Sequence, residues 1–204
     1  GGMETVGTDD RRLADIRGRY AGMVFQNPAA SLNPVMKWWE RTVGLPLRLH
    51  YDLTAVERRE RVRAMIRKVG LPDDVLGKFP HELSGGQQQR VGIATALITS
   101  PRFIIAEADD PRFDSITQRQ IVRLLVSLVD DMGASLLFIT HDFAVLAHAT
   151  THCYVLDEGR IVESGRSPPT CSPRPRDERT RRLIGAAREL TLHAGDAGDK
   201  EQSS

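Results

Sequence analysis

The stretch Leu83–Arg90, which reads Leu-Ser-Gly-Gly-Gln-Gln-Gln-Arg, decides the fold of this 204-residue chain. A hydroxyl, two glycines and an amide precede apolar residues at helical spacing, so the sequence predicts a helix that begins here. Such a start offers free backbone N–H groups and a positive dipole end, which suit an anion. A Cβ in place of either glycine hydrogen would hold a phosphate away from those amides. Ser-Gly-Gly alone fits an ordinary Ser-capped helix, whereas the whole octapeptide is far more specific.

Outward from this stretch, short apolar runs alternate with helical patterns. Three runs are expected to be buried strands, and a helix that stops at Gly133 separates the last two. Asp157-Glu158-Gly159 lies between two further strand-like runs and predicts a hairpin. The order favours an α/β domain with a mostly parallel sheet and an inserted helical block, roughly 35–98. The expected strands are 23–25, 103–106, 136–139, 153–156 and 160–163.

The composition narrows the class of protein. A formal net charge of +1, with 27% charged residues, gives no general attraction to nucleic acid or anionic lipid. No apolar run approaches the roughly 20 residues that a membrane helix needs, and no signal peptide is recognisable, so a cytoplasmic chain is expected. The two cysteines, Cys153 and Cys171, have no metal-type spacing. Arginines between 58 and 67 alternate with glutamates and are expected to form a solvated helix surface.

The octapeptide resembles the signature motif of ATP-binding cassette (ABC) ATPases. The resemblance implies a P-loop NTPase-like ABC ATPase domain, present here in part, and a head-to-tail pair of such domains. In that pair each signature closes over the γ-phosphate of an ATP held by the opposite subunit. By this resemblance Ser84, Gly85, Gly86 and Gln87 would contact the ATP of a partner.

Other segments match the family in the expected order. Gly22–Pro28 resembles the Q-loop, so Gln26 would contact Mg²⁺ and the attacking water. The following Ser31–Pro34 is similar to the oligopeptide and dipeptide importer branch. Ile139–Asp142 resembles the switch-histidine loop, in which His141 would hydrogen-bond the γ-phosphate. With the hairpin sequence that ends at Gly165, the resemblance covers roughly residues 7–165.

Two departures from the family pattern bear on activity. The chain has no Gly-x-x-x-x-Gly-Lys-[Ser/Thr], the P-loop that cradles phosphates. In the Walker B region, alignment without gaps puts Glu107 at the Mg²⁺-ordering Asp and Ala108 at the catalytic Glu. Losing a positioned base typically costs ~10²–10⁴ in rate. A rival register would instead use Asp109 and Asp110 as the two carboxylates. Either way, this chain alone is expected to bind and hydrolyse ATP poorly.

The expected domains are a partial nucleotide-binding domain at 1–165 and a C-terminal extension at 166–204. The extension would hold a Pro- and Arg-rich linker, a short helix near 178–192 and a disordered tail. It departs from the peptide-importer pattern, of which Thr180 and Arg181 are a remnant, and this weakens the assignment of peptides as substrate. His148 and His152 have a spacing that can hold a metal, but no carboxylate completes a site.

The resemblance therefore implies the ATP-binding subunit of an ABC importer for peptides, with ATP and Mg²⁺ as cofactors. This chain would supply its signature to a second nucleotide-binding subunit and dock on transmembrane permease subunits, at the inner face of the membrane. Two alternatives stay open: a fragment of a complete ABC ATPase, and a non-transport regulatory module with an ABC fold. DNA-repair cassette proteins fit less well, because the charge is near neutral.

Overall fold

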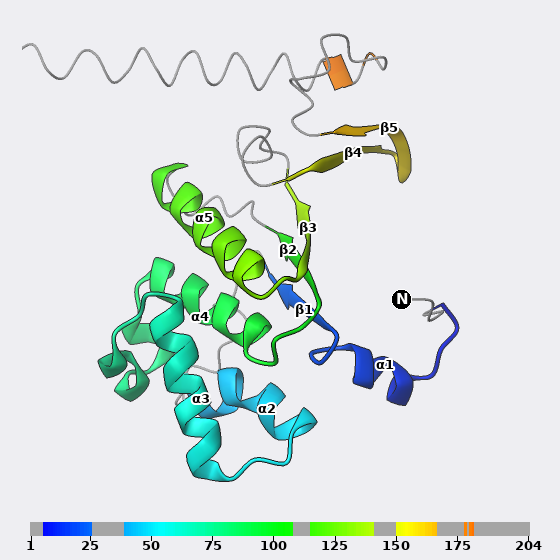
Figure 1. Cartoon of the computed structure of the whole chain (residues 1–204). Coiled ribbons are helices and arrows are strands. Elements are labelled where there is room, and N and C mark those ends of the chain that lie inside the picture. The colour runs from blue at the N-terminus through cyan, green and yellow to red at the C-terminus, as the bar shows by residue number, and fades with distance from the viewer. Residues whose placement is uncertain are drawn as a thin grey trace, which may run out of the picture. The chain divides into compact units, whose positions relative to one another are not determined.

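The computed structural model describes residues 6–25, 39–107, 115–140 and 150–166, together with 178, 180 and 181. The chain divides into two compact units, Gly1–Ile139 and Thr140–Ser204. Figure 1 traces both. The predicted boundary at residue 165 stays a prediction, because residues 167–177 lie outside the described part. The helices of the first unit are α1 (Asp10–Ile16), α2 (Gly44–His50), α3 (Ala55–Lys68), α4 (Gly85–Leu97) and α5 (Ser115–Asp131).

A three-stranded parallel sheet forms the centre of the first unit, in the spatial order β1-β2-β3. Gly22 aligns with Ile104, and Ile104 aligns with Leu136, so the three strands run in step. The carboxyl ends of all three strands consequently lie along one edge of the sheet. The predicted strands are confirmed to within two residues, and the parallel sheet is confirmed with them. The strands are β1 (Ala21–Val24), β2 (Phe103–Glu107) and β3 (Ser135–Ile139).

A helical block connects β1 to β2, as predicted. It contains α2, α3 and α4, a π-helical turn at Trp39–Val43, and 3₁₀ turns at Asp73–Gly77 and Pro80–Glu82. Thr54 caps α3 in a reciprocal box with Glu57, which is the arrangement that the sequence predicts. After α5, Gly133 takes a φ of +60°, and the N–H of Ala134 donates to the carbonyl of Val129. This left-handed cap explains why the helix ends there.

The core lies between the helical block and one face of the sheet. α4 and α5 pack on that face, and the side chains of Ile104 and Ala106 are almost fully buried there. Figure 1 shows both helices on the same side of the strands. The core side chains with no exposed surface are Val43, Leu47, Val62, Ile66, Val69, Val75, Val91, Ile93, Ala94, Leu97 and Ile104.

The arginines of α3 contact groups of this chain. Arg59 lies over the ring of Trp39 at 5.6 Å, and Arg61 lies over Tyr51 at 5.7 Å. Arg67 binds the carboxylate of Asp73 through two nitrogens, at 2.8 and 2.6 Å. The guanidinium groups therefore stabilise the helical block, which refines the predicted solvated surface into a set of specific contacts.

The amino end of β1 is attached to the carboxyl end of α4. The Thr99 hydroxyl donates to the carbonyl of Gly18, and the Tyr51 hydroxyl donates to the carbonyl of Thr99 at 2.9 Å. A Cβ on Gly22 would lie against the carbonyl oxygen of Ala96 and 3.1 Å from Pro101 Cγ. The backbone of β1 thus approaches α4 as closely as a glycine allows.

The second unit contains an antiparallel hairpin of β4 (His152–Asp157) and β5 (Arg160–Arg166). Glu158 and Gly159 form its two-residue turn with φ of +46° and +75°, as the predicted hairpin requires. Burial, together with the nearby Glu163 carboxylate, raises the pKa of the Cys153 thiol and disfavours its reactive thiolate. Among the helices that the structure describes, none combines the length and the apolar character needed to cross a membrane.

Candidate functional site

The helix predicted at Leu83–Arg90 forms, and Ser84 is its N-cap. The N–H of Gln87 donates to Ser84 Oγ at 3.3 Å, and the N–H of Ser84 donates to Gln87 Oε1 at 3.0 Å. This reciprocal capping box satisfies two of the four backbone donors that a helix start leaves without an intrahelical acceptor. It explains locally why a hydroxyl and an amide three residues apart begin α4.

The two remaining donors belong to the glycines. Gly85 and Gly86 occupy the first and second positions of α4, where an N–H group has no carbonyl of the helix to bond. Gly85 is exposed, and a Cβ on Gly86 would meet nothing within 4 Å. The start of α4 therefore presents two adjacent amides, at the positive end of a 13-residue helix, to open space.

Two neighbouring side chains hold this helix start in place. Gln88 Nε2 donates to the carbonyls of Pro80 and Leu83, at 3.0 and 3.2 Å. Arg90 Nη1 donates to the carbonyl of Val69, at 2.6 Å, and so connects α4 to the end of α3. Sequence reasoning did not assign these anchors. In the sequence, Gln88 and Arg90 could have been recognised as polar side chains that interrupt the apolar pattern of the helix.

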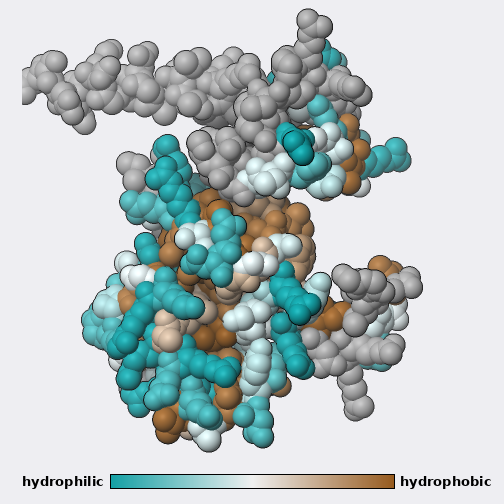
Figure 2. All heavy atoms as spheres, in the orientation of Figure 1, coloured by the Kyte–Doolittle hydropathy of each residue, from teal (hydrophilic) through white to brown (hydrophobic). Residues whose placement is uncertain are grey.

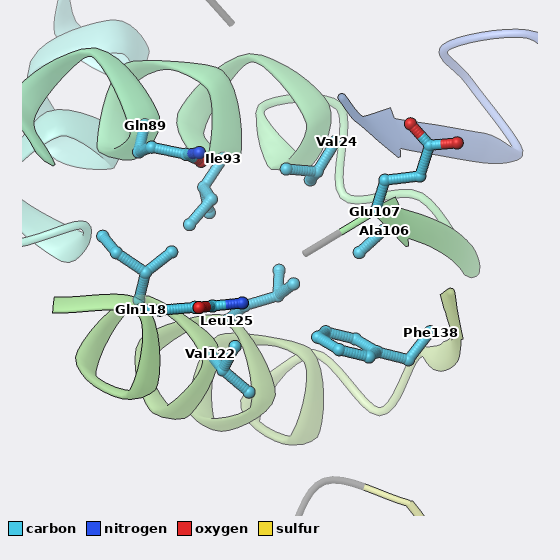
Figure 3. Close-up of a pocket in the computed structure, with 10 residues that line it drawn as sticks. Val24, Gln89, Ile93, Ala106, Glu107, Gln118, Val122, Leu125 and Phe138 are labelled. Atoms are coloured by element: carbon cyan, nitrogen blue, oxygen red, sulfur yellow. The ribbon is translucent and has the colours of Figure 1, made fainter. Parts of the chain in front are cut away.

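A second set of predicted residues belongs to the carboxyl edge of the sheet. Glu107 is the last residue of β2, aligned with Ile139 at the end of β3, and it is partly buried. Figure 3 shows its carboxylate pointing away from Val122 and Phe138, to the face of the sheet opposite α4 and α5. Glu107 therefore places a carboxylate at the edge where the three strands end.

A pocket lies between α4, α5 and the covered face of the sheet (Figure 3). Its walls are mainly apolar, and the polar residues in its lining are Gln89, Gln118 and Glu107. The lining residues are Val24, Gln89, Ile93, Ala106, Glu107, Gln118, Ile121, Val122, Leu125 and Phe138.

The structure brings Ser84, Gly85, Gly86 and Gln87 together in one turn of α4. The other predicted site residues lie outside the described residues: Gln26, Ala108, Asp109, Asp110 and His141. Within the described ranges, no group of three or more His, Cys, Asp or Glu side chains is arranged to hold a metal ion. His152 lies in β4, and its predicted companion His148 is also outside the described residues.

Curated relatives share this sequence over most of its length. The oligopeptide transport ATP-binding protein OppF of Escherichia coli strain K12 is 46% identical over 144 residues, which are 70% of this chain and 43% of OppF. A putative peptide import ATP-binding protein of Brucella abortus strain 2308 is 40% identical over 165 residues, 80% of this chain and 48% of the relative. The chain thus spans about half the length of these relatives.

The fold has solved counterparts. The ATP-binding cassette MJ0796, solved as a dimer in a post-hydrolysis state with ADP and Pi, matches with a TM-score of 0.70 at 33% identity. The match covers 80% of this chain and 70% of MJ0796. It confirms the predicted cassette fold. The family model described as ABC transporter matches residues 4–112, and with these relatives it shows that the chain belongs to the ABC transporter family.

Proposed function

We propose that this chain is an ATP-binding subunit of an ABC importer for peptides, and that it chiefly supplies its signature turn to an ATP held by a partner subunit. The peptide assignment is supported by the similarity to the oligopeptide transport protein OppF and to the peptide import protein of Brucella abortus. The observation that carries the proposal is the exposed start of α4, where Gly85 and Gly86 present two amides.

The chemistry of this turn fits the terminal phosphate of a nucleotide. Backbone N–H groups and the positive end of a helix dipole stabilise negative charge. Ser84 Oγ accepts a hydrogen bond from the N–H of Gln87, so its own O–H hydrogen is available to a phosphate oxygen. Gln87 accepts the Ser84 N–H through Oε1, so the donor that its side chain can offer to a phosphate is Nε2.

The nucleotide half-site of this chain is proposed to be weak. In the ungapped register Ala108 occupies the position of the catalytic base, and an alanine side chain cannot orient or deprotonate water. Losing a positioned base typically costs ~10²–10⁴ in rate. Gln26 and His141 would remain to contact Mg²⁺, water and the γ-phosphate.

Mg²⁺ would neutralise phosphate charge in this half-site, and Glu107 is the described residue that could hold it. Its carboxylate lies at the edge where the strands end. The position of Glu107 as the last residue of β2 supports the ungapped register over the one that uses Asp109 and Asp110. The proposed partners are a second cassette subunit in a head-to-tail pair and the transmembrane permease subunits.

The experiment pairs this chain with OppF of Escherichia coli whose own signature serine is replaced by arginine. In that mixture, ATP hydrolysis at the OppF nucleotide site requires a signature from this chain. We expect hydrolysis to appear on addition of the chain and to disappear with Ser84→Arg, because the arginine side chain fills the space in front of the two amides.

Thr54→Arg is the matched control. Thr54 is also exposed and caps α3 in the same reciprocal box, but it lies at a different helix start. It should leave hydrolysis unchanged. Hydrolysis that does not depend on Ser84 would contradict signature donation and would favour the regulatory module. Strong hydrolysis by this chain alone would contradict the weak half-site.

A further inference from the structure

The peptide bond between Leu83 and Ser84 is held at both of its polar ends by side chains of α4. Its N–H belongs to Ser84 and donates to Gln87 Oε1 at 3.0 Å. Its carbonyl belongs to Leu83 and accepts from Gln88 Nε2 at 3.2 Å. Because a peptide unit is planar, bonds at its two ends fix the direction of its plane. Two successive glutamines thus orient the link through which the chain enters the signature turn, Ser84–Gln87.

Gln88 also bonds the backbone on either side of this link. Its Nε2 donates to the carbonyl of Pro80 at 3.0 Å, and the same carbonyl accepts the N–H of Leu83 at 3.2 Å. The backbone N–H of Gln88 donates to the carbonyl of Ser84 at 2.9 Å. Gln88 therefore bonds the two carbonyls that flank the Ser84 Cα, from which the hydroxyl projects.

The capping box leaves the Leu83 carbonyl available to a side chain. In a continuous helix the N–H of Gln87 would bond the carbonyl four residues back, which is that of Leu83. Here this N–H bonds Ser84 Oγ instead. Successive residues of a helix point roughly 100° apart, so the next glutamine, Gln89, faces elsewhere and lines the pocket in Figure 3. The three successive glutamines consequently have separate contacts, and Gln88 is the one that reaches Leu83.

We propose that Gln88 is a positioning residue for the reaction at the partner's ATP: its amide fixes the direction in which the Ser84 hydroxyl and the amides of Gly85 and Gly86 point. This inference rests on the proposed signature donation. Donors stabilise a developing charge best when they are aimed before the reaction, so a turn that is free to rotate loses rate. A displacement of ~1 Å is enough to cost about 10²-fold.

Losing this amide should affect the rate more than the fold. Figure 2 shows mainly hydrophilic surface over the helical block, and both Ser84 and Gly85 are exposed. Water can therefore replace Gln88 as the donor to the Leu83 carbonyl, which avoids the cost of an unsatisfied acceptor. A water molecule does not fix the direction of the peptide plane, because it is not attached to α4.

The test uses Gln88→Met in the mixed pair with OppF described above, since methionine is also unbranched but has no N–H. We expect kcat to fall about 10–100-fold while KM for ATP stays within about threefold, because the ATP is held by OppF. Gln88→Lys keeps an N–H donor and should restore most of kcat. Gln120→Met is the matched control, because Gln120 is an exposed glutamine on α5. Circular dichroism at the assay temperature confirms that each variant is folded.

Hydrogen exchange in the chain alone tests the geometry without ATP. We expect the Ser84 N–H to exchange about tenfold faster in Gln88→Met, because the peptide plane is released at its other end. The N–H of Val91, further along α4, should exchange as before. Gln88→Glu is a second variant in case Gln88→Met fails to fold, since a carboxylate offers only acceptors at neutral pH.

The outcomes separate this proposal from signature donation. A kcat for Gln88→Met within about twofold of the original chain, where Ser84→Arg abolishes hydrolysis, would overturn the positioning role and leave donation intact. A loss that appears in KM alone would overturn it too, because it would assign Gln88 to binding. No hydrolysis with the original chain would contradict donation itself. An unchanged exchange rate of the Ser84 N–H would overturn the positioning role in either case.

Discussion

Ser84 and Gln87 cap each other across the first turn of α4, each accepting a hydrogen bond from the backbone N–H of the other. This mutual cap positions the turn without any ligand and leaves the amides of Gly85 and Gly86 available. The groups that fold the helix start are thus partly distinct from those that we propose contact phosphate.

Removing the hydroxyl should therefore lower stability as well as signature donation. We expect Ser84→Ala to reduce the free energy of unfolding by about 1 kcal/mol, as for other N-cap serines. Urea denaturation monitored by circular dichroism measures this. Ser84→Gly should cost only a few tenths of a kcal/mol, because glycine is a tolerated N-cap. Equal losses for the two substitutions would indicate that the cap contributes nothing specific.

Substitution by alanine should lower the stability of the chain at Gly22 and raise it at Gly86. A Cβ on Gly22 would lie against the carbonyl oxygen of Ala96, so Gly22→Ala should destabilise the chain by about 1–3 kcal/mol, as overpacking does. Gly86 lies in a helix with open space around its Cβ position, so Gly86→Ala should stabilise by up to about 1 kcal/mol. Thermal unfolding of the two variants side by side checks this. A stable Gly22→Ala variant would contradict the close approach of β1 and α4.

Shortening either of the two adjacent isoleucines in β2 should lower the free energy of unfolding by different amounts, because their side chains point to opposite faces of the sheet. Ile104 has no exposed surface, and Ile104→Val should cost about 0.5–1.5 kcal/mol. Ile105 points to the other face of the sheet and is partly exposed, so Ile105→Val should cost clearly less. Urea unfolding gives both values. Equal costs would mean that Ile105 is buried as deeply as Ile104.

Acid should remove the contribution that the Asp73 carboxylate makes to the stability of the helical block. The hydrogen bonds from Arg67 lower the pKa of Asp73, and the positive charges of Arg67 and Arg63 lower it further. Because the folded pKa lies below that of the unfolded chain, ~3.9, the stabilisation is present above this value. It is lost as the pH falls through the lowered folded pKa.

Asp73→Asn tests this pH dependence. The variant should be less stable than the original chain at about pH 6, and the difference should shrink as the pH falls below ~3.9 and through the lowered folded pKa of Asp73. Urea midpoints across this range provide the measurement, and Asp74→Asn is a neighbouring control, since Asp74 pairs with Lys78 instead. A difference that persists unchanged in acid would show that the charge of Asp73 is not responsible.

The sequence predicted most of what depends on local pattern. The cap at Ser84, the cap at Thr54 and the turn at Glu158-Gly159 all follow from residue types at fixed spacing, and all three are confirmed. Strand positions are confirmed because apolar runs between turn residues are short and distinct.

Long-range contacts were not predictable in the same way. Arg90 reaches the carbonyl of Val69, 21 residues away, and Thr99 reaches Gly18 across 81 residues. No local spacing indicates either bond. The difference in burial between the two faces of the sheet was not predictable either, because strands of a parallel sheet are apolar on both faces whether or not a layer covers them. Ile104 and Ile105 look alike in the sequence and differ only in what lies above them.

The attachment of α4 at both ends gives it a mechanical character. At its carboxyl end Thr99 bonds Gly18 beside β1, and at its amino end Gln88 and Arg90 bond the surrounding turns. A 13-residue helix is about 20 Å long and stiff. A displacement of Ser84 would accordingly be transmitted along α4 to β1, because the helix is stiff and is bonded at both ends.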